Sequence, residues 1–169
     1  MTKWILMFGG IIFGALAQLF LPPWPIFGGI KPPVLMAFAL YYALTDSRRG
    51  MWIAAFSAAL LHDGLDLGGF GPALIGFPII CLLIHRVRLE IFVDGTVTQM
   101  ICGAAGGMFV MLVTVLIYAI SGQRPFHFGY VLLRLIGSGL LGMVTLPLVA
   151  LSMNKLNAIL PKRRGYGWQ

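Results

Sequence analysis

Six apolar segments follow one another along the chain, separated by short stretches rich in charged residues, proline or glycine. They cover residues 4–21, 32–44, 51–67, 73–84, 97–120 and 130–156. A helix needs about 20 apolar residues to cross the roughly 30 Å hydrocarbon core of a bilayer. The pattern predicts an all-α membrane protein, with about six transmembrane helices forming one bundle and one domain. Four spans, also an even number, are the alternative if the second to fourth segments include a re-entrant hairpin. Both termini would then still lie on the same side of the membrane.

Composition agrees with lipid as the solvent. Of the 169 residues, 59% are hydrophobic and only 10% are charged, whereas a soluble domain carries about 25% charged residues. The net charge of +7 indicates basic loops that face anionic lipid headgroups, and we expect no nucleic-acid partner. Cys81 and Cys102 lie in separate apolar segments without metal-ligand spacing, so we expect buried thiols and no metal or other cofactor.

The distribution of basic residues predicts the orientation. The first segment has features of a secretory signal peptide, including Ala15-Leu16-Ala17 as a cleavage site, but its length favours an uncleaved first span. With the N-terminus in the cytoplasm, the outer loops hold only Lys31 and Arg124. Most other cations, including those of the basic tail at residues 161–169, then lie on the cytoplasmic side. We therefore predict a multi-pass protein of the bacterial inner membrane with both termini in the cytoplasm.

Asp63 and Asp66 are the most informative residues, because a carboxylate within hydrocarbon costs about 2.5–3.5 kcal/mol. Three residues apart on a helix, they share one face. The functional interpretations are a cation or proton site, a polar contact with a substrate, and a hydrogen-bonded cluster that binds a partner or fixes the fold. The plain alternative is that both carboxylates cap the outer turn and bind water.

Two further polar residues accompany them. His62 suggests acid–base chemistry, but it faces away from its neighbour Asp63, and the chain has no nucleophile motif. We therefore expect no enzyme. Arg134 either extends to the outer interface or forms an ion pair with Asp63 or Asp66.

Small residues four apart allow helix backbones to approach closely, either within the chain or against a partner. The candidates are Ala54, Ala55, Ala58, Ala59, Gly103 and Gly107. The cytoplasmic loops provide the other candidate contacts, with acidic lipid or a cytoskeletal partner, unless their charges are simply solvated. These residues are Arg48, Arg49, Arg86 and Arg88.

A recognisable pattern runs from Pro33 to Gly76. A helix that starts at prolines is followed by a basic loop, a small-residue helix ending near Asp63, and a glycine-rich turn. The residues that carry it are Tyr42-Ala43-Leu44, Arg48-Arg49-Gly50, Asp63, Gly68-Gly69-Phe70-Gly71 and Leu74. This stretch, about a quarter of the chain, resembles the MreD family of bacterial rod-shape-determining membrane proteins.

The resemblance implies a non-enzymatic scaffold that binds MreC, a bitopic periplasmic protein. Through it the complex would connect MreB filaments to RodA and its penicillin-binding transpeptidase. The implied fold is a six-helix bundle similar to the substrate-binding subunit of energy-coupling-factor transporters. That similarity supplies the alternative function, a subunit that binds a vitamin-like small molecule.

Overall fold

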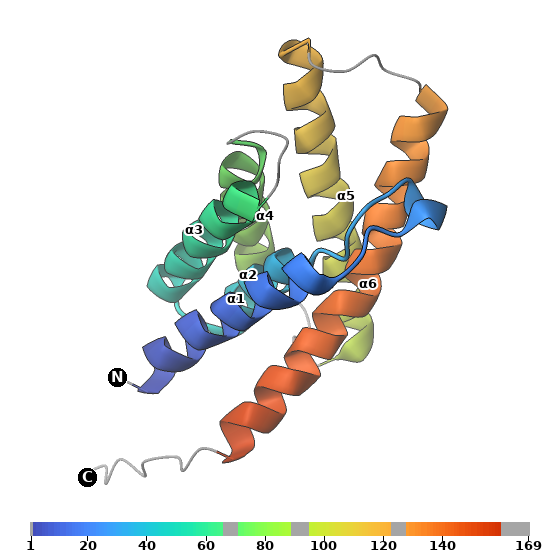
Figure 1. Ribbon diagram of the computed structural model, residues 1–169. Helices are drawn as coiled ribbons and strands as arrows, with labels where there is room; N and C mark the ends of the chain where they lie inside the picture. The colour runs from blue at the N-terminus through green and yellow to red at the C-terminus, as the bar shows by residue number, and fades with distance from the viewer. Residues whose placement is uncertain (1, 66–70, 89–94, 123–127, 160–169) are drawn as a thin grey trace, which may run out of the picture.

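The computed structural model describes residues 2–65, 71–88, 95–122 and 128–159. These residues form an all-helical bundle (Figure 1), in which a short 3₁₀ helix, η1, lies between the first two α-helices. The elements are α1 (Thr2–Phe20), η1 (Pro25–Phe27), α2 (Val34–Thr45), α3 (Arg48–Leu65), α4 (Pro72–Val87), α5 (Thr96–Ile120) and α6 (Phe128–Ile159). An α-helix therefore lies at each of the six predicted segments.

Helix α2 occupies the centre of the bundle and packs against all five other α-helices. Its residues from Leu35 to Leu44 are all buried, as expected for a helix that is apolar on every side. Twelve residues span only about 18 Å. The shortness of α2 follows from its position, since protein surrounds it on every side.

Three helices are long and apolar enough to cross a membrane, namely α1, α5 and α6. Helices α2 and α4 are apolar but shorter, and α3 begins with Arg48 and Arg49. Large apolar side chains are exposed along α1 and α5, for example Phe13, Phe20, Ile101 and Leu116. These are the features of a helical membrane protein.

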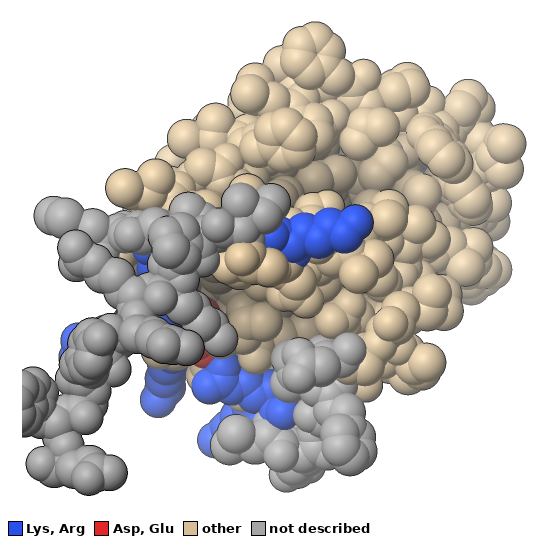
Figure 2. All heavy atoms as spheres, turned by 90° about the horizontal axis from the view of Figure 1, so that it is seen from below, with Lys and Arg blue, Asp and Glu red and all other residues tan. Residues whose placement is uncertain are grey.

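The ends of the helices meet at two opposite ends of the bundle. Near the start of α1 lie the end of α2, the start of α3 and the end of α4, joined by contacts of Lys3, Asp46 and Arg88. Helix α6 also ends on this side (Figure 1). We call this the basic end, because Lys and Arg side chains gather there (Figure 2). The other end holds the end of α3, the start of α4 and a cavity.

Candidate functional site

Asp63 connects the end of α3 to the start of α4. Its carboxylate is buried and accepts three backbone hydrogen bonds, from Gly71 and Ala73 at 3.0 Å and from Leu74 at 3.1 Å. The first amides of a helix lack partners within the helix and carry a partial positive charge. Asp63 thus caps α4 from eight residues upstream. These bonds give Asp63 the capping role of the plain alternative and also fix the entry into α4, whereas Asp66 lies outside the described residues.

Gly71 allows the chain to enter α4 at this point. Its φ of 135° lies in a region that side-chain-bearing residues rarely adopt, and its amide faces Asp63. Glycine adopts such angles at little steric cost. The conformation of Gly71 and the carboxylate of Asp63 therefore act together to orient α4.

A second buried carboxylate, Asp46, joins helices at the basic end. It accepts a 2.6 Å bond from the Lys3 ammonium and a bond from the Ser47 amide. Burial by itself would raise the pKa of the Asp46 carboxyl. The hydrogen bonds and the charge of Lys3 outweigh burial, so its pKa lies below the ordinary value. Asp46 is therefore ionised at neutral pH and links α1 to the junction of α2 and α3.

The end of α4 is fixed to the same junction. Arg88 donates to the carbonyl oxygen of Asp46, and His85 Nδ1 lies 2.9 Å from the carbonyl oxygen of Ala43. Gly50 is required there, because a Cβ would stand 2.3 Å from a carboxylate oxygen of Asp46. Neither His85 nor Asp46 was among the candidate residues predicted from the sequence. Lys3 and Asp46 are 43 positions apart, so their pairing leaves no local pattern.

The predicted cytoplasmic contacts differ in exposure. Arg48 and Arg49 form the first turn of α3 and are exposed, as is Arg86. Arg88 is half-buried and holds the carbonyl of Asp46, so it serves packing within the chain. The helix begins at Arg48 because Ser47 precedes it, and the Ser47 hydroxyl accepts a bond from the Gly50 amide.

The small-residue candidates all pack inside the bundle. Ala54, Ala55, Ala58 and Ala59 are fully buried. A Cβ on Gly103 would lie 2.2 Å from the carbonyl oxygen of Gly142, and one on Gly107 equally close to that of Ser138. These contacts bring α5 and α6 into close backbone contact. The six positions therefore offer no face to a partner helix, which corrects the docking interpretation.

Arg134 contacts η1 and its own helix, and its predicted pairing with Asp66 involves a residue outside the described ranges. Its Nε donates to the carbonyl oxygen of Gly28 at 3.0 Å, and its guanidinium lies over the Tyr130 ring, 4.9 Å from the centroid. The Tyr130 hydroxyl donates to the same carbonyl. Within the described ranges Arg134 makes no ion pair with Asp63, whose oxygens accept backbone amides. Arg134 thus attaches the segment around η1 to α6. We call residues 23–33 the η1 segment.

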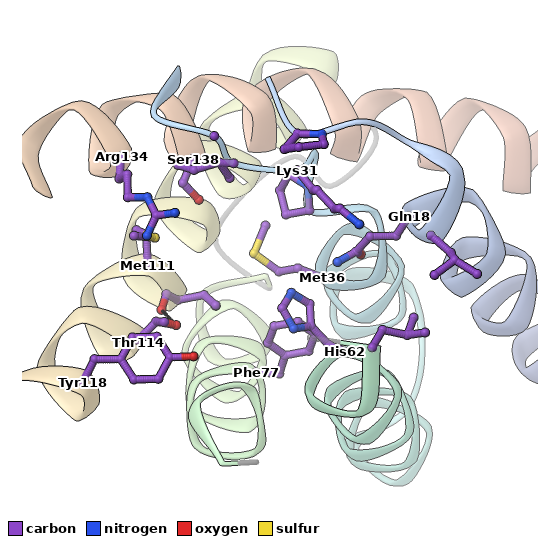
Figure 3. A pocket seen from close by; sticks show the side chains of 17 residues that line it. Gln18, Lys31, Met36, His62, Phe77, Met111, Thr114, Tyr118, Arg134 and Ser138 are labelled. Carbon is purple, nitrogen blue, oxygen red and sulfur yellow. Dashed lines mark hydrogen bonds between the residues drawn. The ribbon is translucent and has the colours of Figure 1, made fainter. Parts of the chain in front are cut away.

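A cavity of about 330 Å³ lies beside this contact, between the η1 segment and the five helices α2 to α6, with the end of α1 at its rim. Figure 3 shows side chains from these elements directed into it. Its apolar wall includes Met36, Phe77, Val110 and Met111. His62 stands in its wall against Phe77, with ring centroids 5.3 Å apart. The polar residues that line it are Gln18, Lys31, His62, Thr114, Tyr118, Arg134 and Ser138.

The cavity could not be predicted from the sequence, because its polar residues lie on four helices and one loop that are far apart in the chain. Cys81 and Cys102, by contrast, are free and buried, as expected for small apolar side chains.

No protein-family profile, curated protein or solved structure matches the chain.

Proposed function

We propose that the chain is a non-enzymatic integral-membrane scaffold of the bacterial cell-elongation machinery. In this proposal it lies in the inner membrane with both termini in the cytoplasm, and all six helices contribute to one bundle similar to the energy-coupling-factor subunit. It binds an MreC-like bitopic protein and connects it to RodA, its penicillin-binding transpeptidase and MreB. This helps to maintain rod shape.

The observation that carries the proposal is the use of the polar groups in the segment that resembles MreD. This segment folds as one unit, in which α2 packs against α3 and α4. Its two described aspartates serve the fold, because Asp63 caps α4 and Asp46 fixes the basic end. The outward faces of α1 and α5 are left apolar, and such faces suit another transmembrane helix as well as lipid.

A cross-linking experiment tests the proposal. A photoreactive residue replaces Phe13 on the exposed face of α1, Leu112 on that of α5, or Leu148 on that of α6. We expect one of these faces to cross-link to a bitopic periplasmic protein in living cells, and depletion of the chain to round rod-shaped cells. If no face captures such a protein and depleted cells remain rods, the scaffold proposal is wrong.

The cavity favours the second candidate, a subunit that binds a vitamin-like molecule for an energy-coupling-factor transporter. Its volume lies at the lower end of the range for small-molecule sites, about 300–1,000 Å³. Uptake of a radiolabelled vitamin that depends on the chain and on a cellular ATPase would support this candidate. Unchanged uptake of all vitamins after deletion of the chain would contradict it.

A further inference from the structure

We infer that the cavity between the η1 segment and the helix bundle binds a small organic anion, a carboxylate or phosphate joined to an apolar body. The inference goes beyond the scaffold function, which requires no small-molecule site. It concerns the cavity alone, so it stands or fails separately from the scaffold.

The first argument is charge. Lys31 and Arg134 both line the cavity, and neither forms an ion pair in the part of the chain that the structure describes. The described lining residues include no Asp or Glu. Two cations at one cavity, with no carboxylate partner among the described residues, leave a positive field that an anion would neutralise.

The second argument is the set of hydrogen-bond donors that remain. Arg134 uses Nε on Gly28, which leaves its two Nη groups to donate to an anion. The buried Gln18 uses its Oε1 on the Leu35 amide, so its NH₂ group can also donate. In Figure 3, Arg134, Lys31 and Gln18 lie along one side of the cavity. Donors on one side predict that the anionic group binds there.

The third argument is the opposite wall. Phe77 and His62 lie across the cavity from Lys31, with Met36 between them (Figure 3). Phe77 is fully buried and gives this wall an apolar surface beside the His62 ring. Flexible thioethers such as that of Met36 adapt to irregular apolar shapes. A ligand with an aromatic or aliphatic body therefore fits better than inorganic phosphate alone.

The turn that supplies Lys31 is held in place by the protein itself. Trp24 and Ile30 form a backbone bridge, and Gly28 and Gly29 both adopt positive φ angles. The Gly28 carbonyl is bonded to α6 through Tyr130 and Arg134. The cavity is thus largely formed before a ligand binds, which reduces the entropic cost of binding.

The test uses 2-naphthoate as the anionic probe and 2-naphthamide as its neutral counterpart. Each is titrated calorimetrically into the full chain in phosphatidylcholine nanodiscs, with empty nanodiscs subtracted. We expect saturable binding of naphthoate, about tenfold tighter than naphthamide, because charge-assisted hydrogen bonds exceed neutral ones by about this much. Equal binding of the two probes, or no binding of naphthoate, would overturn the inference.

Variants assign the effect to the cavity. We expect Lys31→Gln and Arg134→Gln each to lower the affinity for naphthoate by about fivefold or more. Arg134→Lys should lower it less, because it keeps the positive charge. The matched control Arg49→Gln removes the same charge at the basic end and leaves the affinity unchanged. Lys31 is exposed, so Lys31→Gln decides the matter even if an Arg134 variant does not fold. Wild-type affinity in Lys31→Gln and in every folded Arg134→Gln sample would overturn the assignment.

A competition arm identifies the source of the anion. Dihexanoyl phosphatidylglycerol and dihexanoyl phosphatidylcholine are each added to the naphthoate complex. Displacement by the anionic lipid alone assigns the site to a membrane headgroup. Displacement by neither lipid assigns it to a soluble organic acid. Equal displacement by both lipids would show that charge is not recognised and would overturn the inference.

Discussion

Each of the two described aspartates replaces the hydration that it loses with a defined set of donors. Asp63 accepts hydrogen bonds from three backbone amides. Asp46 accepts one from an ammonium group and one from a backbone amide. A buried carboxylate is tolerated when such donors satisfy it, and removing the acceptor leaves the donors unsatisfied. The two residues are therefore expected to be sensitive in different ways.

Asp63→Ala removes the acceptor for three amides at the start of α4. We expect it to lower the free energy of unfolding by about 2–4 kcal/mol, from the loss of a helix cap and the burial of unpaired amides. Asp63→Asn keeps one oxygen and should lose less. Gly64→Ala is the matched control, because a Cβ there meets nothing within 4 Å. Unfolding in mixed micelles, followed by circular dichroism, measures the difference, and an unaffected Asp63→Ala would contradict the capping role.

Asp46 makes stability depend on acidic pH. Its folded pKa lies below the ordinary value, since the bonds from Lys3 and Ser47 outweigh burial. Such a carboxyl contributes stability that is complete above the unfolded pKa, about 4, and is lost as pH falls through the folded pKa. We expect the midpoint temperature of thermal unfolding, measured in nonionic detergent, to decrease as the pH is lowered below about 4. In Lys3→Gln the fall should begin at the same pH but be smaller and be complete at a higher pH, because the folded pKa lies closer to the unfolded one. Identical profiles would refute the pairing.

At the scale of the elements, hydropathy was sufficient to place the helices. All twelve helix ends lie within three residues of the predicted segment ends, because prolines, glycines and charged residues interrupt the apolar runs. Hydropathy could not show which helix the others surround. The sequence of α2 only indicated a short apolar helix, and its central position follows from contacts with five helices.

Candidate site residues were harder to predict than helices. Asp63 stood out because a carboxylate in an apolar run is costly, yet its partners in α4 depend on how the chain returns after the turn. The hydrogen bond of Arg134 could not be predicted, because its acceptor is the carbonyl of Gly28, 106 residues away. A carbonyl acceptor leaves no signal in the sequence, whereas a charged partner does. The cavity was missed because its lining residues come from segments that are far apart in the sequence and meet only in the folded chain.

The contact between α5 and α6 depends on glycine. In Gly107→Ala, the new Cβ would meet the backbone of Ser138, which cannot move aside as a side chain can, and the Ser138 bond to the Gly107 carbonyl would be strained. We expect a loss of about 1–3 kcal/mol of unfolding free energy, typical of overpacking. Gly129→Ala in α6 meets nothing within 4 Å and should be neutral or stabilising. Equal stability of the two variants would mean that the helices can separate at little cost.

At the scale of the whole molecule, the two ends of the bundle differ in charge and in construction. The basic end is tied together by Asp46 and carries the exposed cations Lys3, Arg48, Arg49 and Arg86. The opposite end holds the cavity, with Lys31 and Arg134 in its wall. Cations in short loops are retained on the cytoplasmic side of a membrane. The asymmetry therefore favours an orientation in which the cavity opens outward.

Accessibility labelling tests this orientation, since both native cysteines are buried and an added cysteine can report alone. Lys31→Cys, at the cavity, should react with a membrane-impermeant maleimide in intact cells. Arg49→Cys, at the basic end, should react only after the inner membrane is permeabilised. A tag on the C-terminus should behave like Arg49→Cys, because α6 ends on that side. Labelling of Arg49→Cys or of the tag in intact cells would reverse the orientation and with it the proposed access of MreB to the basic end.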